Sequence, residues 1–298
     1  MDKVAVGAVV TAFHPDGILD QLIEELARQV AYIVVVDNTP VGERTVENRH
    51  PTHRLEYIRT GKNLGLAAAL NCGVQHLERF CLSHVSFWDQ DSVPPPGYVR
   101  EALVRSRSLA EWPNVIVCGD HVGPADLVTP GVDRSEQKVI RLITSGMLVP
   151  VPALRSVGPF REDFFVDAVD MDFSLRARAH GVSLYTIRDL AIRHRLGDPA
   201  RSRKPFLFRS ETSGHPVWRH YWIVRNQTIL LDEYRRLDVE AVSVIKKTQR
   251  RWFLRHLMAG PDRLRLVSAI VIGRRDARNG RVREFYDPRT GGGRGIRR

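Results

Sequence analysis

The first 120 residues alternate uninterrupted apolar runs with segments in which apolar residues recur at helical spacing. A continuous apolar run is typical of a strand that is covered on both faces. Alternation of such strands with helices through short connections predicts the α/β class, with a mostly parallel, doubly wound sheet. The expected strands are residues 3–11, 31–36, 55–59, 85–88 and 115–119, and the expected helices lie at 18–30, within 63–77 and at 97–106.

The pattern changes after residue 142, and the second half of the chain mixes strands and helices in a different order. The expected elements are a strand at 142–150, a helix at 169–180, a strand at 183–187, a mobile loop at 198–217 and helices at 218–236, 241–258 and 263–275. We therefore expect an α/β domain over residues 1–215, an amphipathic, basic helical region over 216–286 and a disordered basic tail over 287–298.

The net charge of +11 is concentrated in the last third of the chain. Residues 199–298 carry 24 Lys and Arg against 9 Asp and Glu, whereas the remaining residues carry a slight negative excess. Such a block suits nucleic acid, anionic lipid or a phosphorylated substrate, or it is simply a solvated helical surface.

The sequence also indicates in which cellular compartment the protein works. No uncharged stretch approaches the ~20 apolar residues that span a bilayer, and residues 4–13 lack the flanks of a signal peptide. Three cysteines without CxxC spacing argue against a disulfide framework and predict a cytoplasmic protein.

Three of the expected strands end in polar residues. Thr11 and Phe13 lie at the end of the first strand, Asp37 at the end of the second, and Asp89 and Asp91 at the end of the fourth. Ligands of open parallel sheets bind beyond the carboxyl ends of the strands. One aspartate there is often only a turn former, but three polar ends together predict a shared binding crevice.

Asp89 and Asp91 flank a single residue, so their carboxylates can share a hard divalent cation that also binds a sugar phosphate. Most such pairs in proteins form turns. Here the pair follows the apolar residues 85–88 and precedes three prolines, which favours the functional interpretation.

Residues 61–71 form a glycine-bearing turn that enters a helix rich in small residues. The spacing matches neither a P-loop nor the GxGxxG of dinucleotide-binding proteins. Two interpretations stay open. Asn63 and Gly65 either begin a tightly packed helix, or they bring the start of that helix toward a nucleotide.

Four aspartates lie within ten residues, at positions 163, 167, 170 and 172. Asp167 and Asp170 are three residues apart, so on a helix they would lie on one face, and an acid beside a reacting hydroxyl can act as a general base. Asp172 and Arg176 are four residues apart, so a helix ion pair is the alternative for Asp172. His194 follows an apolar run and, taken alone, is more readily structural than a metal ligand.

Taken in order, these segments resemble the inverting glycosyltransferases of the GT-A fold, which use nucleotide-sugar donors, and among them the bacterial rhamnosyltransferases. The resemblance runs from residue 4 to about residue 231. It is carried by residues 10–15 (VTAFHP), 36–38 (VDN), 63–71 (NLGLAAALN), 88–92 (WDQDS), 144–146 (TSG), 158–160 (GPF), 164–167 (FFVD), 169–176 (VDMDFSLR) and 194–197 (HRLG).

The resemblance implies roles for individual residues. The donor nucleotide would be bordered by Thr11, Phe13, Asp37, Asn63, Gly65 and Asp89. Asp91 and His194 would hold Mg²⁺ or Mn²⁺, and Asp170 would be the catalytic base. Support of the base or the acceptor would fall to Asp167, Asp172, Arg176 and Trp88. Many relatives carry Glu-Asp at the base position, whereas this chain has Val169 before Asp170, and Asp167 is the expected replacement for that Glu.

The implied reaction is metal-dependent transfer of a sugar, from dTDP-L-rhamnose, to a hydroxyl of a glycan or lipid-linked glycan in bacterial cell-surface polysaccharide synthesis. A UDP-sugar donor such as UDP-galactofuranose is the alternative, because thymine and uracil differ by one methyl group. Residues 1–120 would form the nucleotide-binding half of the domain, and residues 121–215 the acceptor and catalytic half.

The resemblance also gives the basic helices a role. They interleave aromatic and basic residues, which suits peripheral contact with the anionic inner face of the cell membrane. The aromatics could equally form a subdomain core or a homo-oligomer contact. A nucleic-acid-binding protein is a remote alternative, because the basic residues lie apart from Asp89 and Asp91 and no nucleic-acid motif is present.

Overall fold

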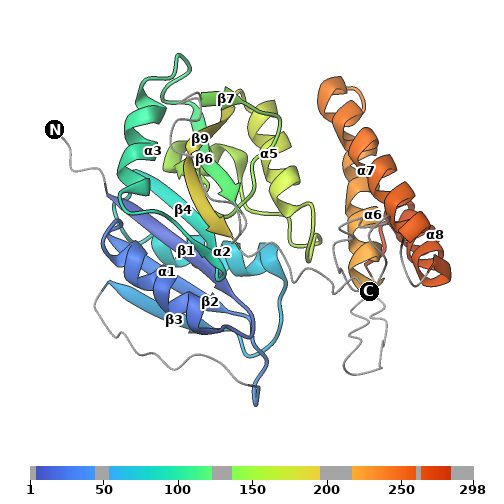
Figure 1. The fold of residues 1–298 in the computed structure, drawn as a ribbon, viewed down its shortest axis with the longest axis horizontal. Coiled ribbons are helices and arrows are strands. Elements are labelled where there is room, and N and C mark those ends of the chain that lie inside the picture. Colours follow the sequence, from blue (N-terminus) through green and yellow to red (C-terminus); the bar gives the residue numbers. More distant parts are fainter. Residues whose placement is uncertain (1–4, 44–53, 123–135, 195–216, 260–262, 283–298) are drawn as a thin grey trace, which may run out of the picture. The chain divides into compact units, whose positions relative to one another are not determined.

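The computed structural model describes residues 5–43, 54–122, 136–194, 217–259 and 263–282 (Figure 1). The chain divides into two compact units, Met1–Phe165 with Val169–Arg195 and Val166–Ala168 with Leu196–Arg298. The loop expected at 198–217, except for its last residue, and the tail expected at 287–298 lie outside the described residues.

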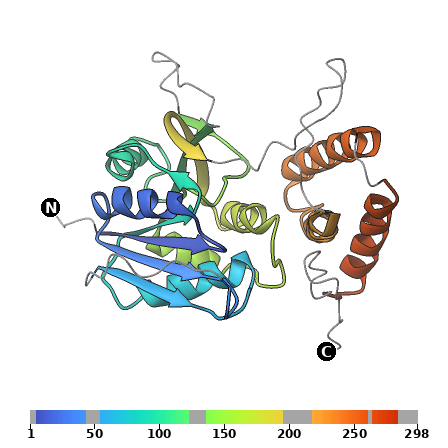
Figure 2. The ribbon, with the colours of Figure 1, turned by 60° about the horizontal axis from the view of Figure 1, so that its bottom comes forward.

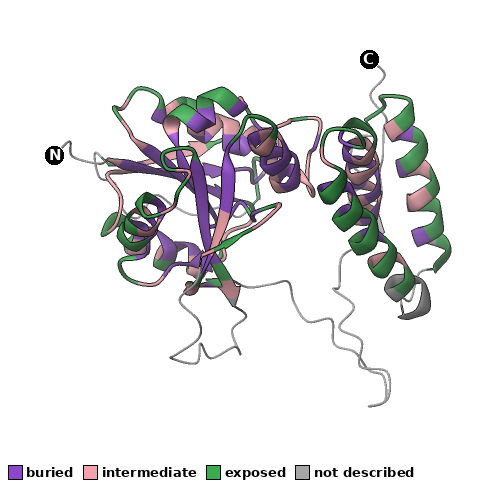
Figure 3. Cartoon of the chain, turned by 90° about the horizontal axis from the view of Figure 1, so that it is seen from above, coloured by how far each residue is buried: buried purple, intermediate pink, exposed green. Residues whose placement is uncertain are grey.

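The first unit is built on one mixed sheet whose N-terminal part is parallel, as the apolar runs predict. β2 pairs with β1 and β3, and β1 also pairs with β4, in every case parallel. These strands are β1 (Val6–Ala12), β2 (Tyr32–Asp37), β3 (Leu55–Arg59) and β4 (His84–Asp89). Every residue of β1 is buried, so β1 lies in the core of the first unit. Figure 3 shows strands of the sheet coloured as buried.

The other part of the sheet is mixed, and the full order is β3-β2-β1-β4-β8-β6-β9-β5, with β7 pairing β9. β6 and β9 are parallel, whereas β8, β5 and β7 pair antiparallel to their neighbours. The bounds are β5 (Ser92–Val93), β6 (Val115–Val122), β7 (Glu136–Lys138), β8 (Leu148–Pro150) and β9 (Ser183–His194).

Two of the strand predictions in this part need correction. The strand expected at 142–150 is β8 alone, because Gly146 has a φ of +83° and interrupts the extended backbone. The strand expected at 183–187 continues to His194. The register between β6 and β9 shifts after Gly119, so β9 loops out residues 188–190 and then pairs again.

Helices cover both faces of this sheet (Figure 2). They are α1 (Gly17–Ala27), α2 (Leu66–Leu77), α3 (Tyr98–Arg107), α4 (Val151–Val157) and α5 (Val169–Ala179), of which α4 was not expected. The Asp16 side chain caps α1 by accepting the Ile18 N–H at 3.0 Å. Gly73 lets α2 approach β1 closely, since a Cβ there would lie 2.3 Å from Cγ1 of Val9.

The second unit contains α6 (Val217–Glu233), α7 (Val239–Ala259) and α8 (Arg263–Arg278). Its aromatic residues pack against each other. Trp222 is 2% exposed, and the ring centroids of His220 and Trp252 lie 4.7 Å apart. This packing favours the subdomain-core interpretation of the aromatics. None of the helices in the described part of the chain is long and apolar enough to cross a membrane.

Candidate active site

The polar ends of the first, second and fourth strands lie together at one edge of the sheet. In the parallel register Thr11 is level with Asp89, and Ala12 is level with Asp37. The Thr11 hydroxyl donates to Oδ1 of Asp89 over 3.5 Å. The predicted convergence of these strand ends is therefore what the sheet produces.

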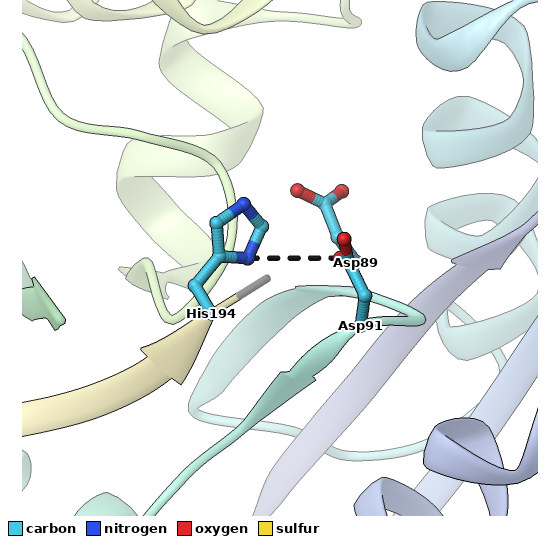
Figure 4. A group of neighbouring side chains, drawn as sticks. All are labelled: Asp89, Asp91 and His194. Carbon is cyan, nitrogen blue, oxygen red and sulfur yellow. Dashed lines mark ion pairs between the residues drawn. The ribbon is translucent and has the colours of Figure 1, made fainter. Parts of the chain in front are cut away.

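Asp89, Asp91 and His194 form a cluster at this edge (Figure 4), and each offers one ligand atom within 4.8 Å of the others. Antiparallel pairing of β5 with β9 sets Ser92 level with His194, which brings the histidine to Asp91 from 103 positions further along the chain. The His194 Nδ1 lies 3.6 Å from Oδ1 of Asp91 and 2.5 Å from the Ser92 hydroxyl.

The cluster brings negatively charged carboxylates close together. Burial and the Asp91 carboxylate raise the pKa of Asp89 to about 6, and the charge of Asp170 adds to that rise. His194 and the Thr11 hydroxyl act in the opposite direction. A divalent cation would relieve this repulsion, and carboxylate and imidazole groups are common ligands of divalent cations in proteins. The residues present therefore fit a metal site.

Gln90, the residue between the two aspartates, was not singled out from the sequence. Its side chain holds the end of β1 by accepting the Phe13 N–H at 2.8 Å and donating to the Phe13 carbonyl at 3.0 Å. Phe13 itself is 41% exposed, so part of its side chain is accessible to a ligand. The only sequence signal for Gln90 is its place between two predicted site residues.

A second set of contacts fixes the loop before α2 beside the end of β2. Asp37 is buried, and its Oδ1 accepts the Thr39 N–H at 2.9 Å. Asn38 donates from Nδ2 to the Gly65 carbonyl at 2.9 Å, and Asn63 Oδ1 accepts the Gly65 N–H at 3.0 Å. Asn38 belongs to the 36–38 segment of the family resemblance, but the resemblance gave it no role of its own.

Gly65 is required at its position for two reasons. Its φ is +88°, and a Cβ would lie 2.6 Å from the carbonyl oxygen of Phe165. The next residue, Leu66, donates its N–H to the same carbonyl at 2.7 Å. The glycine-bearing turn is therefore both a close-packed helix start and a contact with the segment that leads to α5.

Asp170 lies in the first turn of α5, where its Oδ1 accepts the Met171 N–H at 2.8 Å. The amino end of a helix stabilises a carboxylate through its exposed N–H groups and dipole. The charge of Asp170 contributes to the raised pKa of Asp89, so Asp170 interacts electrostatically with the cluster of Asp89, Asp91 and His194.

Two of the expected supporting residues are buried. Asp172 is 1% exposed and accepts from Arg176 Nε at 2.8 Å, which favours the ion-pair alternative. Trp88 is 0% exposed, and its indole N–H donates to the Ser86 hydroxyl at 3.0 Å. Neither side chain is exposed to solvent in the structure.

Asp167 has a different environment. Its carboxylate forms a two-point ion pair with Arg219 of α6, with Nε–Oδ2 at 2.9 Å and Nη2–Oδ1 at 3.0 Å. Burial raises its pKa, although Arg219 opposes that rise. Asp167 and Ala168 both have left-handed backbones, with φ of 63° and 62°, and α5 begins only at Val169. The expectation that Asp167 and Asp170 share one face of a helix is therefore wrong.

Comparison with models of protein families shows which family the chain belongs to. The model of glycosyl transferase family 2 matches residues 8–163, which is more than half of the chain. The chain belongs to glycosyl transferase family 2. It is a glycosyltransferase of the GT-A fold, as the resemblance of its motifs implied.

Individual relatives agree with this family. The dTDP-rhamnosyl transferase RfbF of Shigella flexneri is 27% identical over 243 residues, which are 75% of this chain and 79% of that protein. The solved structure of S. aureus TarS has a TM-score of 0.54 at 13% identity, covering 87% of this chain and 44% of its own. GalNAc-T7, solved with UDP, GalNAc and Mn²⁺, has a TM-score of 0.55 at 10% identity, covering 88% and 57%.

The two solved structures support the fold and nothing finer, because their identities are low. This chain spans about half the length of each of them. What this site can bind is therefore argued from this chain's own geometry, namely the cluster of Asp89, Asp91 and His194.

Proposed function

We propose that this family 2 enzyme transfers L-rhamnose from dTDP-L-rhamnose to a hydroxyl of a glycan or lipid-linked glycan, with inversion at the anomeric carbon. The observation that carries the proposal is the meeting of Asp89, Asp91 and His194 within reach of the charge of Asp170. The choice of sugar is supported by the likeness to the rhamnosyl transferase RfbF over three quarters of the chain.

The proposed donor site is the edge of the sheet. Thr11, Phe13 and Asp37 would border the nucleotide from the ends of β1 and β2, and Asn63 and Gly65 would border it from the loop before α2. A divalent cation held by Asp91 and His194, with Asp89 beside them, would neutralise charge on the departing diphosphate.

Asp170 would accept the proton of the acceptor hydroxyl as that oxygen attacks the anomeric carbon from the face opposite the leaving group. A single displacement of this kind inverts the anomeric centre. The base must lie about 3 Å from the proton that it removes. A carboxylate in the first turn of a helix is held in a fixed direction, which suits this role.

A UDP-sugar donor is the second candidate, because an apolar contact with one methyl group is worth only about 1–3 kcal/mol. The test is a thermal shift with Mn²⁺ or Mg²⁺ across dTDP-L-rhamnose, UDP-galactofuranose, UDP-glucose and GDP-mannose. A donor that binds the folded chain raises its melting temperature by mass action.

A metal-dependent shift with dTDP-L-rhamnose alone is the expected result. A shift with a UDP-sugar alone would replace the donor and leave the site intact. Absence of a shift with every donor, in a chain that melts cooperatively, would contradict the proposal of a preformed donor site.

The acceptor side of the proposal rests on α7. Lys246, Lys247, Arg250 and Arg251 are exposed along one stretch of this helix and, with Leu254, line a hollow of about 420 Å³. We propose that this basic surface contacts an anionic membrane that carries the acceptor; a homo-oligomer contact is the alternative. Flotation with vesicles of anionic and of neutral lipid tests it, because salt weakens an electrostatic contact.

Binding to anionic vesicles alone, reversed by high salt and by changing the four basic residues to Gln, would support the membrane contact. Equal flotation of the fourfold variant would contradict it. A concentration-dependent change in mass without vesicle binding would favour the oligomer.

A further inference from the structure

Side chains of α6, in the second unit, contact the turn that precedes Asp170. Residues 166–168 are grouped with that unit, whereas Phe165 and Val169 on either side belong to the first. The covalent chain thus passes into the second unit for three residues, immediately before the helix that carries Asp170. Val169 and Asp170, the first two residues of α5, follow this turn directly in the chain.

The backbone of this turn is unusual. Asp167 and Ala168 are consecutive residues with positive φ, and neither is a glycine. A residue with a side chain persists in the left-handed region only where surrounding contacts hold it there. Two such residues in succession therefore need a rigid support.

Asn226 of α6 supplies part of that support. It is 0% exposed, and its Nδ2 donates to two successive carbonyls of the turn, Val166 at 3.0 Å and Asp167 at 2.9 Å. Its Oδ1 accepts from Nη1 of Arg225 at 2.8 Å. Both amide hydrogens and the amide oxygen are thus used, which fixes the orientation of this side chain.

Arg219 supplies the rest. Its guanidinium meets the Asp167 carboxylate through two nitrogens, a planar pairing that a lysine cannot reproduce. Arg219 and Asn226 together hold both the side chain and the carbonyl groups of the turn from one helix.

We propose that Arg219 and Asn226 are positioning residues, which hold the 166–168 turn in its left-handed conformation and thereby aim Asp170 at the acceptor hydroxyl. This inference rests on the proposed function of Asp170 as the base. By this inference, Arg219 and Asn226 of α6 act on catalysis through the turn, and not as ligands of the donor or the cation. It also gives Asp167 the role of anchoring the turn through Arg219.

The test replaces Arg219 with Ala and with Lys, because its side chain is 35% exposed and its loss leaves the buried amide in place. Tyr221→Phe is the matched control. It removes a hydrogen bond that joins α6 to Asp276 of α8 at 3.1 Å and leaves the turn untouched.

Two quantities are measured on each folded variant. The first is amide hydrogen exchange of residues 166–170, which needs no substrate. The second is kcat for nucleotide release from dTDP-L-rhamnose with a cell-envelope glycolipid extract, set against the dissociation constant of the donor.

Arg219→Ala is expected to speed exchange in the turn and to lower kcat about tenfold to a hundredfold, the scale of a misplaced catalytic group. Donor affinity should stay the same. Arg219→Lys should have an exchange rate and a kcat between those of the wild type and Arg219→Ala. Asp167→Asn should have a similar effect, and the double variant should lose no more than either single one, since both remove the same ion pair. Tyr221→Phe should match the wild type in both quantities.

Unchanged exchange in Arg219→Ala would overturn the inference, whatever the enzyme does with a donor. Faster exchange with an unchanged kcat would also overturn it, because loosening the turn would then have no effect on the base. If the wild type turned over no donor at all, the proposed function would fail while the exchange result still decided whether α6 holds the turn.

Discussion

At the scale of single residues, the site depends on groups that the sequence places far apart. Asp91 and His194 are 103 positions apart and meet only because Ser92 pairs with His194 across β5 and β9. Local patterns could select the two aspartates, since both follow a buried strand. They could not select His194, which needed either the fold or a family resemblance.

Loss of one member of the cluster should weaken cation binding before it changes anything else. Asp91→Asn and His194→Ala are each expected to weaken Mn²⁺ binding by about tenfold or more, on the scale of losses around metal sites. The measurement is the rise in melting temperature with Mn²⁺. His76→Ala is the control, because His76 is 40% exposed and faces Glu56 at 3.7 Å. Unchanged Mn²⁺ titrations in both site variants would exclude the cluster as the cation site.

His84 gives a prediction about pH. Burial, with the charge of Arg107, lowers its pKa from 6.5 to about 4 in the folded chain. As pH falls below 6.5 the unfolded chain takes up this proton first, so the folded state loses stability between pH 6.5 and about 4 and keeps it above pH 6.5.

At pH 5 the expected loss is about 2 kcal/mol of the free energy of unfolding relative to pH 7. His84→Gln removes this titration, so urea denaturation curves of the wild type and the variant should differ in their pH dependence by that amount. Parallel pH dependence in the two proteins would refute the assignment.

At the scale of elements, the alternation of apolar runs and helices predicted the parallel strands with only small errors in their ends. The errors were larger where a strand depends on its partner. β9 runs to His194 because its extra residues loop out after Ile187, and Asp189 in that loop pairs with Arg105 of α3 at 3.1 Å. A bulge of this kind is set by contacts between distant segments, so no local periodicity reveals it.

The close approach of α2 to β1 gives a test with an internal contrast. A methyl group at position 73 would meet Val9, which is fully buried. Gly73→Ala is therefore expected to destabilise the chain by about 1–3 kcal/mol, the usual cost of overpacking.

Gly17→Ala is the counterpart at the start of α1, where an added Cβ meets nothing within 4 Å. Its free energy of unfolding should stay the same or rise by less than about 1 kcal/mol, because alanine restricts the unfolded chain. Equal stability of the two variants would show that α2 does not pack as the structure has it.

At the scale of the whole molecule, acidic and basic residues are concentrated in different parts of the chain. The acidic strand ends that make the site lie in the first 198 residues, and the basic excess lies in the last hundred. That division could be predicted from charge alone. The contact of Arg219 with Asp167 could not, because a basic helix gives no sign of which of its arginines faces inward to a carboxylate.

The most direct test of the account is the replacement of Asp170 by Asn, with kcat for donor turnover and the donor dissociation constant measured on the same protein. The wild type and variant are compared with dTDP-L-rhamnose, Mn²⁺ and a cell-envelope glycolipid extract. We predict that kcat falls by about 10²–10⁴, the contribution of a general base, while donor affinity changes little. An Asp170→Asn enzyme that turns over at the wild-type rate would contradict the assignment of the base, and with it the proposed mechanism.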